Sequence, residues 1–221
     1  MAPPATPRIS TRKQPKQARS SQLVADILTA AAQVLASDGA NRFTTARVAE
    51  RAGVSIGSLY QYFPSKEAIL FRLQTDEWER TSALMAGMLA DRSVPALDRL
   101  RAVVRSFVRS ECEEAAMRIA LDDAAPLYRD TPEAKALRQS SQRIIDDFLC
   151  EVLPAMAASE RRLVADVLLM SFGPVAKHLS EAGYTEEEAD IRAQAMGDMF
   201  CAYLDNLAAK CPPNAGKIGP S

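Results

Sequence analysis

The sequence predicts an all-α protein in which a small N-terminal unit of three helices precedes a larger helical domain. Ala, Leu, Arg and Glu dominate the middle of the chain, and these residues favour helix. Apolar residues recur at the three- and four-residue spacing of amphipathic helices, and no stretch has the β-branched alternation of a sheet. With 221 residues and 48% hydrophobic content, the chain is long enough for one small and one larger domain.

The first helix is expected over residues 21–38, where the apolar residues form a single stripe. Gly39 follows, and glycine commonly ends a helix because it adopts the left-handed conformation at little cost. The stripe would pack this helix behind the two short helices that come next.

Residues 43–70 are typical of two short helices joined by a tight turn. Gly53 suits the left-handed conformation that such a turn requires, and Ser55 can cap the second short helix. That helix ends at Phe63, because Pro64 disfavours the helical conformation in the residue before it. The pattern predicts a helix-turn-helix, the motif that presents a helix to the major groove of DNA.

The second short helix carries the expected DNA contacts, with Leu59 facing inward. Its two tyrosines are poor solvent-facing residues but suit phosphates and base edges, and Gly57 allows close approach to a groove. An ordinary helical hairpin with a glycine turn would show a similar pattern of small residues. The candidate DNA-binding residues are Thr45, Ser55, Tyr60 and Lys66 for phosphates, Gly57 for close approach, and Ile56, Ser58, Gln61 and Tyr62 for base edges.

The block GVSIGSLYQYFPSKEAIL resembles the turn and recognition helix of the TetR family of transcriptional regulators, where this segment commonly reads GVSxGxLYxYFxSKExL. The resemblance covers residues 22–73. It implies a DNA-binding head, a divergent C-terminal domain, and pairing of the last two helices of two subunits into a four-helix bundle.

Charge is divided unevenly along the chain, although the net formal charge is −1. Residues 1–75 carry 10 Lys and Arg against 4 Asp and Glu, whereas residues 76–221 carry 17 against 24. A basic head beside an acidic body is typical of a protein that holds DNA at one end. Residues 1–20 are expected to be a disordered arm. Two interpretations stay open: a solvated tail, or contacts with phosphates or a minor groove by Arg8, Arg12, Lys13, Lys16 and Arg19.

The remainder of the chain shows a series of long helical patterns. The expected ranges are 66–78, 81–90, 96–119, 132–153, 159–182 and 186–209, with a break around 122–128. Thr185 and Glu188 match the capping box of the last helix. The expected domains are a helix-turn-helix domain over 21–66, a ligand-binding and dimerisation domain over 67–210, and a disordered tail over 211–221.

The last two helices have apolar residues around more than one face, whereas a peripheral helix needs only one stripe. Burial on two sides explains this pattern, either in a fully internal helix pair or against a second subunit. The TetR resemblance favours a homodimer. The expected interface residues are Leu168, Val175, Leu179, Met196, Phe200, Tyr203, Leu204 and Leu207.

Large Met and aromatic side chains gather in the C-terminal domain, where they are consistent with ordinary core packing or with a pocket for a small, mainly apolar organic ligand. Trp78 is the only Trp of the chain and lies where head and body join, so we expect the ligand near it. The candidate ligand-binding residues are Trp78, Met85, Phe107, Met117, Tyr128, Phe148, Met170 and Phe172.

The sequence offers no catalytic signature. The four Cys lack C-x-x-C spacing and do not neighbour the single His, His178, so no metal or cofactor is expected. There is no signal peptide and no apolar run of about 18 residues, which favours a cytoplasmic protein without membrane contact.

The sequence therefore predicts a ligand-responsive repressor that binds a palindromic operator on double-stranded DNA as a homodimer and is released by a small apolar molecule. A DNA-binding regulator without a ligand and an all-helical enzyme are the alternatives.

Overall fold

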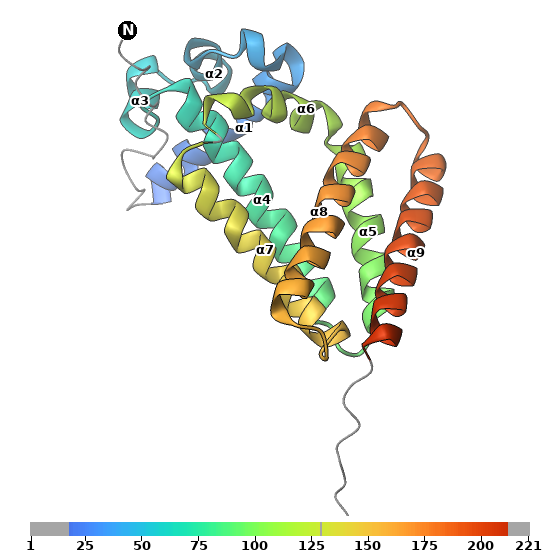
Figure 1. Cartoon of the computed structure of the whole chain (residues 1–221). Coiled ribbons are helices and arrows are strands. Elements are labelled where there is room, and N and C mark those ends of the chain that lie inside the picture. The colour runs from blue at the N-terminus through green and yellow to red at the C-terminus, as the bar shows by residue number, and fades with distance from the viewer. Residues whose placement is uncertain (1–17, 129, 212–221) are drawn as a thin grey trace, which may run out of the picture. The chain divides into compact units, whose positions relative to one another are not determined.

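The computed structural model of the chain describes residues 18–128 and 130–211. This part of the chain is helical, and no strand occurs in it (Figure 1). The predicted all-α fold class is confirmed. Most of the predicted arm and nearly all of the predicted tail lie outside the described residues.

The helices follow the chain with few interruptions. They are α1 (Ala18–Arg42), α2 (Thr45–Ala52), α3 (Ile56–Tyr62), α4 (Lys66–Ala90), α5 (Ala96–Glu113), α6 (Ala115–Ala124), the 3-10 turn η1 (Ala125–Leu127), α7 (Pro132–Val152), α8 (Ala158–Glu181) and α9 (Glu186–Lys210). The predicted capping box is confirmed at α9, where Thr185 Oγ1 accepts from the Glu188 amide and Glu188 Oε2 accepts from the Thr185 amide.

Several predicted helix bounds are wrong. α1 begins at Ala18 rather than residue 21, and it continues to Arg42 with an interruption at Gly39, whose φ is 71°. α4 is one helix, because no Gly or Pro stands near residues 79–80 to break it. The helix predicted over 96–119 is instead divided at Glu114, and no glycine or proline marks that break in the sequence.

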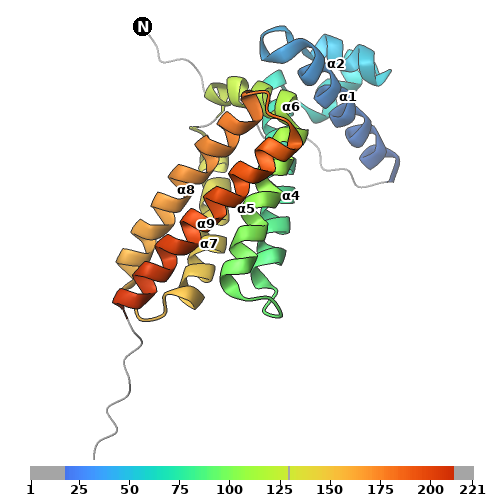
Figure 2. The ribbon, with the colours of Figure 1, turned by 90° about the vertical axis from the view of Figure 1, so that its right-hand side faces the viewer.

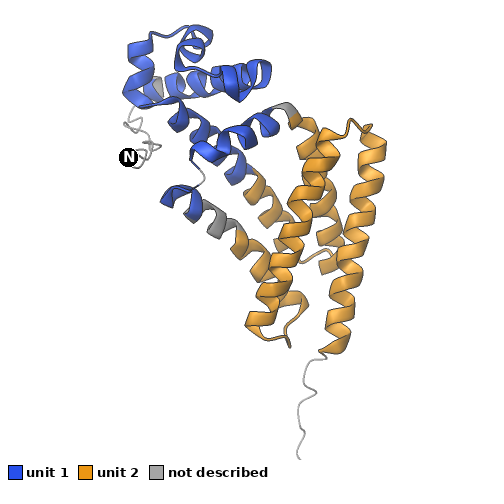
Figure 3. Ribbon diagram, turned by 45° about the horizontal axis from the view of Figure 1, so that its top comes forward, with its two compact units in different colours: residues 1–80, 116–137 blue, residues 81–115, 138–221 orange. Residues whose placement is uncertain are grey.

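The chain forms two compact units, drawn in different colours in Figure 3. The first contains residues up to 80 together with 116–137, and the second contains residues 81–115 together with 138–221. The expected division at residue 66 therefore differs from the observed one. The start of α4, α6 and the start of α7 belong with the helix-turn-helix, because packing decides the division and chain order does not.

The core of the first unit forms where α1, α2, α3 and the start of α4 converge. Its fully buried side chains include Ile27, Leu35, Phe43, Val48, Leu59, Phe63, Ile69 and Leu70. Polar contacts join α6 and Tyr128, the residue after η1, to α4. Arg118 Nη2 lies 2.5 Å from Glu77 Oε1, and the Tyr128 hydroxyl donates to Gln74 Oε1 at 3.1 Å.

The core of the second unit forms where α5 packs against α8 and α9. Figure 2 shows α8 and α9 side by side. Buried members include Val104, Phe148, Leu168, Phe172, Phe200 and Leu204. α9 approaches α5 closely at Gly197, where an added Cβ would stand 3.4 Å from the Arg101 Cα. Two ion pairs join the same helices: Arg101 with Asp198 at 2.7 Å and Arg105 with Asp190 at 2.8 Å.

Two helical segments, Ser20–Arg42 and Ala158–Glu181, are long and apolar enough to cross a membrane by length and composition alone. Charged residues interrupt both segments, for example Asp26 in the first and Asp166 in the second, so neither is an uninterrupted apolar run. In the first segment, Ile27, Ala31 and Leu35 are buried in the core of the first unit. An amphipathic core helix accounts for that pattern.

Candidate nucleic-acid interface

The turn between α2 and α3 has the geometry that the sequence predicts. Thr44 caps α2 by accepting a hydrogen bond from the Arg47 amide at 3.3 Å. Gly53 then adopts the left-handed conformation with φ 67° and ψ 28°. Its amide and that of Val54 donate to carbonyls at the end of α2, which closes the helix and starts the turn.

α3 is held at both ends. At its start, Ser55 Oγ accepts from the Ser58 amide at 3.0 Å, and the two serine hydroxyls are 2.8 Å apart. At its end, the Phe63 amide donates to the Leu59 carbonyl at 3.0 Å. Leu59 and Phe63 are fully buried, so the inner face of α3 is fixed to the core while its outer face stays free of packing.

The outer face of α3 gathers four of the candidate residues at helical spacing. Ile56 and Tyr60 are 43% and 41% exposed, and Gly57 and Gln61 are exposed beside them. A Cβ at Gly57 would meet only the Ser55 hydroxyl, at 3.9 Å, so packing within the protein does not require glycine there. Its predicted role, close approach to a groove, stays a prediction.

The hydroxyls of Thr45 and Tyr60 are hydrogen-bonded at 3.0 Å, which joins the start of α2 to α3. Thr45, Ser58 and Lys66 are half-buried. The hydrogen bond holds Thr45 beside Tyr60 of α3, and the contacts of Thr45, Ser58 and Lys66 with DNA stay predictions.

Tyr62 is not on this outer face, so its predicted role at a base edge is wrong. The side chain is 5% exposed, and its hydroxyl is 2.5 Å from Ser20 Oγ in the first turn of α1. The reason is helical spacing, because Tyr62 lies three residues after the inward Leu59 and shares its face. That spacing is visible in the sequence and was the signal missed.

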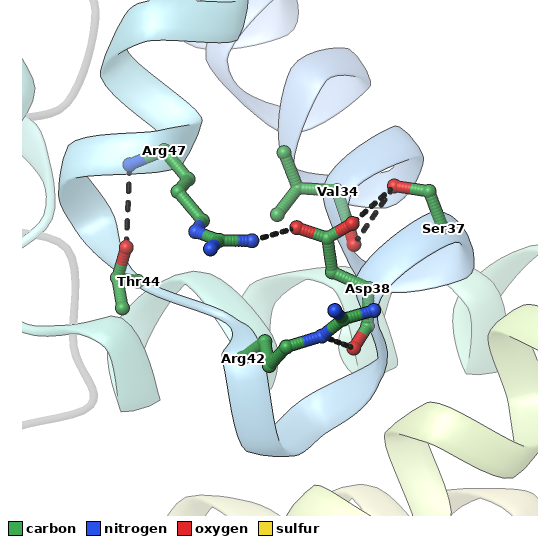
Figure 4. A network of polar contacts seen from close by, with 6 residues as sticks. All are labelled: Val34, Ser37, Asp38, Arg42, Thr44 and Arg47. Atoms are coloured by element: carbon green, nitrogen blue, oxygen red, sulfur yellow. Dashed lines mark hydrogen bonds and ion pairs between the residues drawn. The ribbon is translucent and has the colours of Figure 1, made fainter.

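A cationic group in the first turn of α2 was also missed from the sequence (Figure 4). The Arg47 guanidinium on α2 is paired with the Asp38 carboxylate near the end of α1. Hydrogen bonds from Arg47 and then Ser37 hold the pKa of Asp38 below its ordinary value. Arg42 Nε donates to the Asp38 carbonyl at 3.3 Å. These contacts fasten α1 to α2 and place two arginines beside the motif.

The second unit contains an apolar cavity of about 90 Å³. Ser82 is the single polar residue among the described residues that line it. The lining residues are Ser82, Met85, Leu89, Leu100, Val103, Val104, Ile144, Ile145, Leu168, Leu169, Phe172 and Phe200. A site of this composition has no charged group with which to bind a charged ligand.

The candidate ligand-binding residues are divided between several places. Met85 and Phe172 line the cavity; Phe107 packs on Phe172 with ring centroids 4.5 Å apart, and Phe148 is buried in the same core. The others do not line it. Met117 and Tyr128 pack in the core of the first unit, Met170 is 67% exposed on α8, and Trp78 lies in the first unit, on α4.

The predicted dimer residues are mostly wrong, because the fold of one subunit already buries them. Leu168, Leu179, Met196, Phe200 and Leu204 are at most 6% exposed within the chain. Tyr203 and Leu207 are half-buried against the same core.

A different set of apolar side chains on α8 and α9 is exposed. We call these residues, together with the exposed Val175 of the predicted set, the α8/α9 face. They are Leu163, Val167, Met170, Val175, Ile191 and Met199. Figure 2 shows the two helices next to each other, both toward the viewer.

No group of three or more His, Cys, Asp or Glu that could hold a metal occurs in the described part of the chain. The four cysteines, Cys112, Cys150, Cys201 and Cys211, are free thiols.

Two regions of the chain match known families. Residues 27–73 match "Bacterial regulatory proteins, tetR family", and residues 95–207 match "Tetracyclin repressor-like, C-terminal domain". The nucleoid occlusion factor SlmA of Vibrio campbellii is 39% identical over 80 residues, which are 36% of this chain and 40% of that protein. SlmA of Vibrio atlanticus is 36% identical over 88 residues, which are 39% of this chain and 44% of that protein. The chain thus spans less than half the length of these curated relatives.

Solved structures share the fold over most of the chain. The fatty acid degradation regulator FadR from Bacillus halodurans superposes with a TM-score of 0.67 at 17% identity, covering 85% of this chain and 96% of that one. A TetR-like transcriptional regulator from Rhodococcus superposes with a TM-score of 0.59 at 16% identity, covering 86% and 99%. The family matches cover both the helix-turn-helix and most of the C-terminal helices, and the chain therefore belongs to the TetR family of bacterial transcriptional regulators.

Proposed function

We propose that this DNA-binding regulator is a dimeric repressor, which recognises a palindromic operator in the cytoplasm and is released from it by a small apolar molecule. The observation that carries the proposal is the outer face of α3. Buried Leu59 and Phe63 fix this helix, and it presents Ile56, Tyr60 and Gln61 outward. A rigid helix with an exposed face of mixed apolar and hydrogen-bonding groups is suited to a major groove.

The DNA contacts divide by chemistry. Tyr60, held by its hydrogen bond to Thr45, and Lys66 at the start of α4 are proposed to bind phosphates. Ile56 and Gln61 are proposed to read base edges, since an apolar side chain contacts the thymine methyl and an amide pairs with adenine. Thr45, Ser55, Gly57 and Ser58 complete the surface.

The α8/α9 face supports the proposed homodimer. Met170 and Ile191 are 67% and 60% exposed, and several large exposed apolar side chains on two neighbouring helices are suited to an interaction site. Two subunits joined through this face present two recognition helices related by a two-fold axis. Helix-turn-helix dimers bind half-sites one turn of DNA apart, about 34–36 Å, or a multiple of it, and we expect the same of this operator.

The apolar cavity supports a neutral ligand. A cavity of about 90 Å³ admits only a few heavy atoms, as an apolar cavity of about 150 Å³ suffices for benzene. α4 carries both Lys66, a proposed phosphate contact, and Met85 of the cavity lining. A ligand that favours one position of α4 would therefore change DNA affinity, provided that it binds the two states differently.

Selection of DNA ligands from a random library tests operator recognition. Gln61→Ala should change the enriched sequence, whereas Lys66→Ala should weaken all sequences about equally and lower the salt slope by about 2, because a dimer loses two phosphate contacts. Tyr62→Ala serves as a contrast, because loss of a buried ring destabilises the head without new sequence preference. Failure of the wild-type protein to enrich any sequence would refute operator recognition.

Release is tested with toluene and 1-hexanol as neutral probes and hexanoate as a charged one of matched length. The neutral probes should dissociate the operator complex at lower concentration than hexanoate. Val104→Trp, which fills the cavity, should retain DNA binding and lose this response. A ligand-independent regulator is indicated if neither probe changes DNA binding in the wild type at saturating concentration.

A further inference from the structure

We propose that a cleft between α5 and α9 binds a small zwitterion with an apolar side chain, of the chemical class of the branched-chain amino acids. The cleft has a volume of about 220 Å³ and lies within the second unit. Among the described residues, none lines both this cleft and the apolar cavity. The site is therefore separate from the one at which release by a neutral ligand is proposed, and it does not depend on operator binding.

A row of ion pairs joins α5 to α9 and leads to the cleft. Arg101 pairs with Asp198, and Arg105 pairs with Asp190, so the two helices are antiparallel. The second pair is bidentate, because the Nε and Nη2 atoms of Arg105 donate to the two carboxylate oxygens of Asp190 at 2.9 and 2.8 Å. Both members of this second pair line the cleft, and each satisfies the charge of the other.

The next pair in the row is not made. Arg109 stands four residues after Arg105, which is about one turn further along α5. Glu186 stands four residues before Asp190, about one turn further in the matching direction on α9. Both side chains are exposed and line the cleft. Within residues 18–128 and 130–211, neither makes a hydrogen bond or an ion pair. The cleft thus lies where a third pair would continue the row.

The unpaired groups that line the cleft carry both signs of charge. The guanidinium of Arg109 can bind a carboxylate through two parallel hydrogen bonds. The carboxylate of Glu186 can accept from an ammonium group, and the exposed Glu113 offers a second carboxylate. A simple anion or a simple cation would pair with one of these groups and lie beside a like charge. A molecule that carries both a carboxylate and an ammonium group can pair with both kinds.

The deepest part of the cleft is apolar. Val108 on α5 and Ala189 and Ala193 on α9 are buried, and half-buried Cys112 lies beside them in the lining. Since an apolar cavity of about 150 Å³ holds benzene, about 220 Å³ admits about nine heavy atoms, the size of leucine. A short branched side chain would cover these apolar residues while the two charged groups of the ligand meet the rim.

Calorimetric titration of the full chain tests this assignment with L-leucine, L-isoleucine and L-valine as probes. Isoamylamine has the leucine side chain without the carboxylate, and isocaproate has it without the amine. At least one amino acid should bind and raise the thermal midpoint with concentration. Both analogues should bind about tenfold more weakly or less, because each lacks one charge-assisted hydrogen-bonding group. Absence of binding by all three amino acids at millimolar concentration would overturn the proposal, as would equal binding of the two analogues.

Charge-neutralising variants locate the site. Arg109→Gln and Glu186→Gln should each weaken binding of the amino acid by about tenfold or more. Arg143→Gln and Glu187→Gln are the matched controls, since both residues are exposed in the second unit and do not line the cleft. Glu187 also shares the first turn of α9 with Glu186, so it controls for loss of charge at the start of that helix. Wild-type affinity in the first two variants would show that the amino acid binds elsewhere.

A double-mutant cycle without ligand tests whether the third pair is open. The changes in the free energy of unfolding caused by Arg109→Gln and Glu186→Gln should add in the double variant, because the two side chains do not contact each other. Measurable coupling would show that the two residues form an ion pair across the cleft, and would contradict a site that is open to a ligand.

Discussion

If the α8/α9 face is the dimer interface, charged substitutions on it should dissociate the dimer. Ile191 and Met199 lie eight residues apart on α9 and are 60% and 57% exposed. Phe200, next to Met199 in sequence, is 5% exposed and packs in the core of its own subunit. Arg at position 199 should therefore weaken dimerisation, whereas Arg at position 200 should disrupt the fold of the subunit.

The size of the effect follows from the area that dimerisation would cover. Burying a whole Ile or Met side chain contributes about 1.5–3 kcal/mol. Covering the exposed three-fifths of Ile191 would therefore contribute about 1–2 kcal/mol per subunit, and about 2–4 kcal/mol per dimer by symmetry. Ile191→Arg should weaken dimerisation by about 30- to 1,000-fold, before any cost of burying the charge. The same reasoning applies to Met199→Arg.

Sedimentation velocity over a nanomolar to micromolar range measures this change, and circular dichroism reports folding. Leu84→Arg is the matched control, because Leu84 is a 52% exposed apolar residue on α4, and the variant should stay dimeric. Phe200→Arg should unfold the second unit. If both Ile191→Arg and Met199→Arg sediment with the wild-type dissociation constant, the α8/α9 face is not the interface and the reasoning fails.

Three further predictions concern the stability and reactivity of the fold. Gly53→Ala should lower the free energy of unfolding by about 1–2 kcal/mol in urea titrations, because Gly53 has φ 67° and a Cβ there is strained although no atom lies within 4 Å of it; unchanged stability would contradict this. The Arg99 guanidinium is 3% exposed and donates to Glu151, which lowers the pKa of that carboxyl, so the stability that the pair contributes should be complete above the ordinary carboxyl pKa and be lost as pH falls through the lowered one. Glu151→Gln should remove this loss of stability at low pH. If the free energy of unfolding of the variant and of the wild type changes identically with pH, the pair is not its source. Iodoacetamide should modify exposed Cys150 in the native protein, whereas Cys201, whose thiol pKa is raised by burial, should react only on unfolding, as mass spectrometry can show.

The helix-turn-helix could be predicted from the sequence because its determinants act over a few residues. Gly53 adopts the left-handed turn, Ser55 caps α3, and Pro64 limits its end. The capping box at Thr185 and Glu188 is equally local. Each of these signals is a hydrogen bond or a backbone restriction between near neighbours in sequence, so no knowledge of the tertiary fold is needed to read it.

The tertiary structure decided which apolar residues are buried in the core and which are exposed. On α9, Phe200 and Met199 are adjacent and both apolar, yet one is buried and the other exposed, because only the position of α5 and α8 determines the inner side. The cavity likewise collects Met85 and Phe172 and leaves out Met117 and Met170. Composition specifies how much apolar surface a helix carries, whereas contacts between residues distant in sequence determine where that surface is buried.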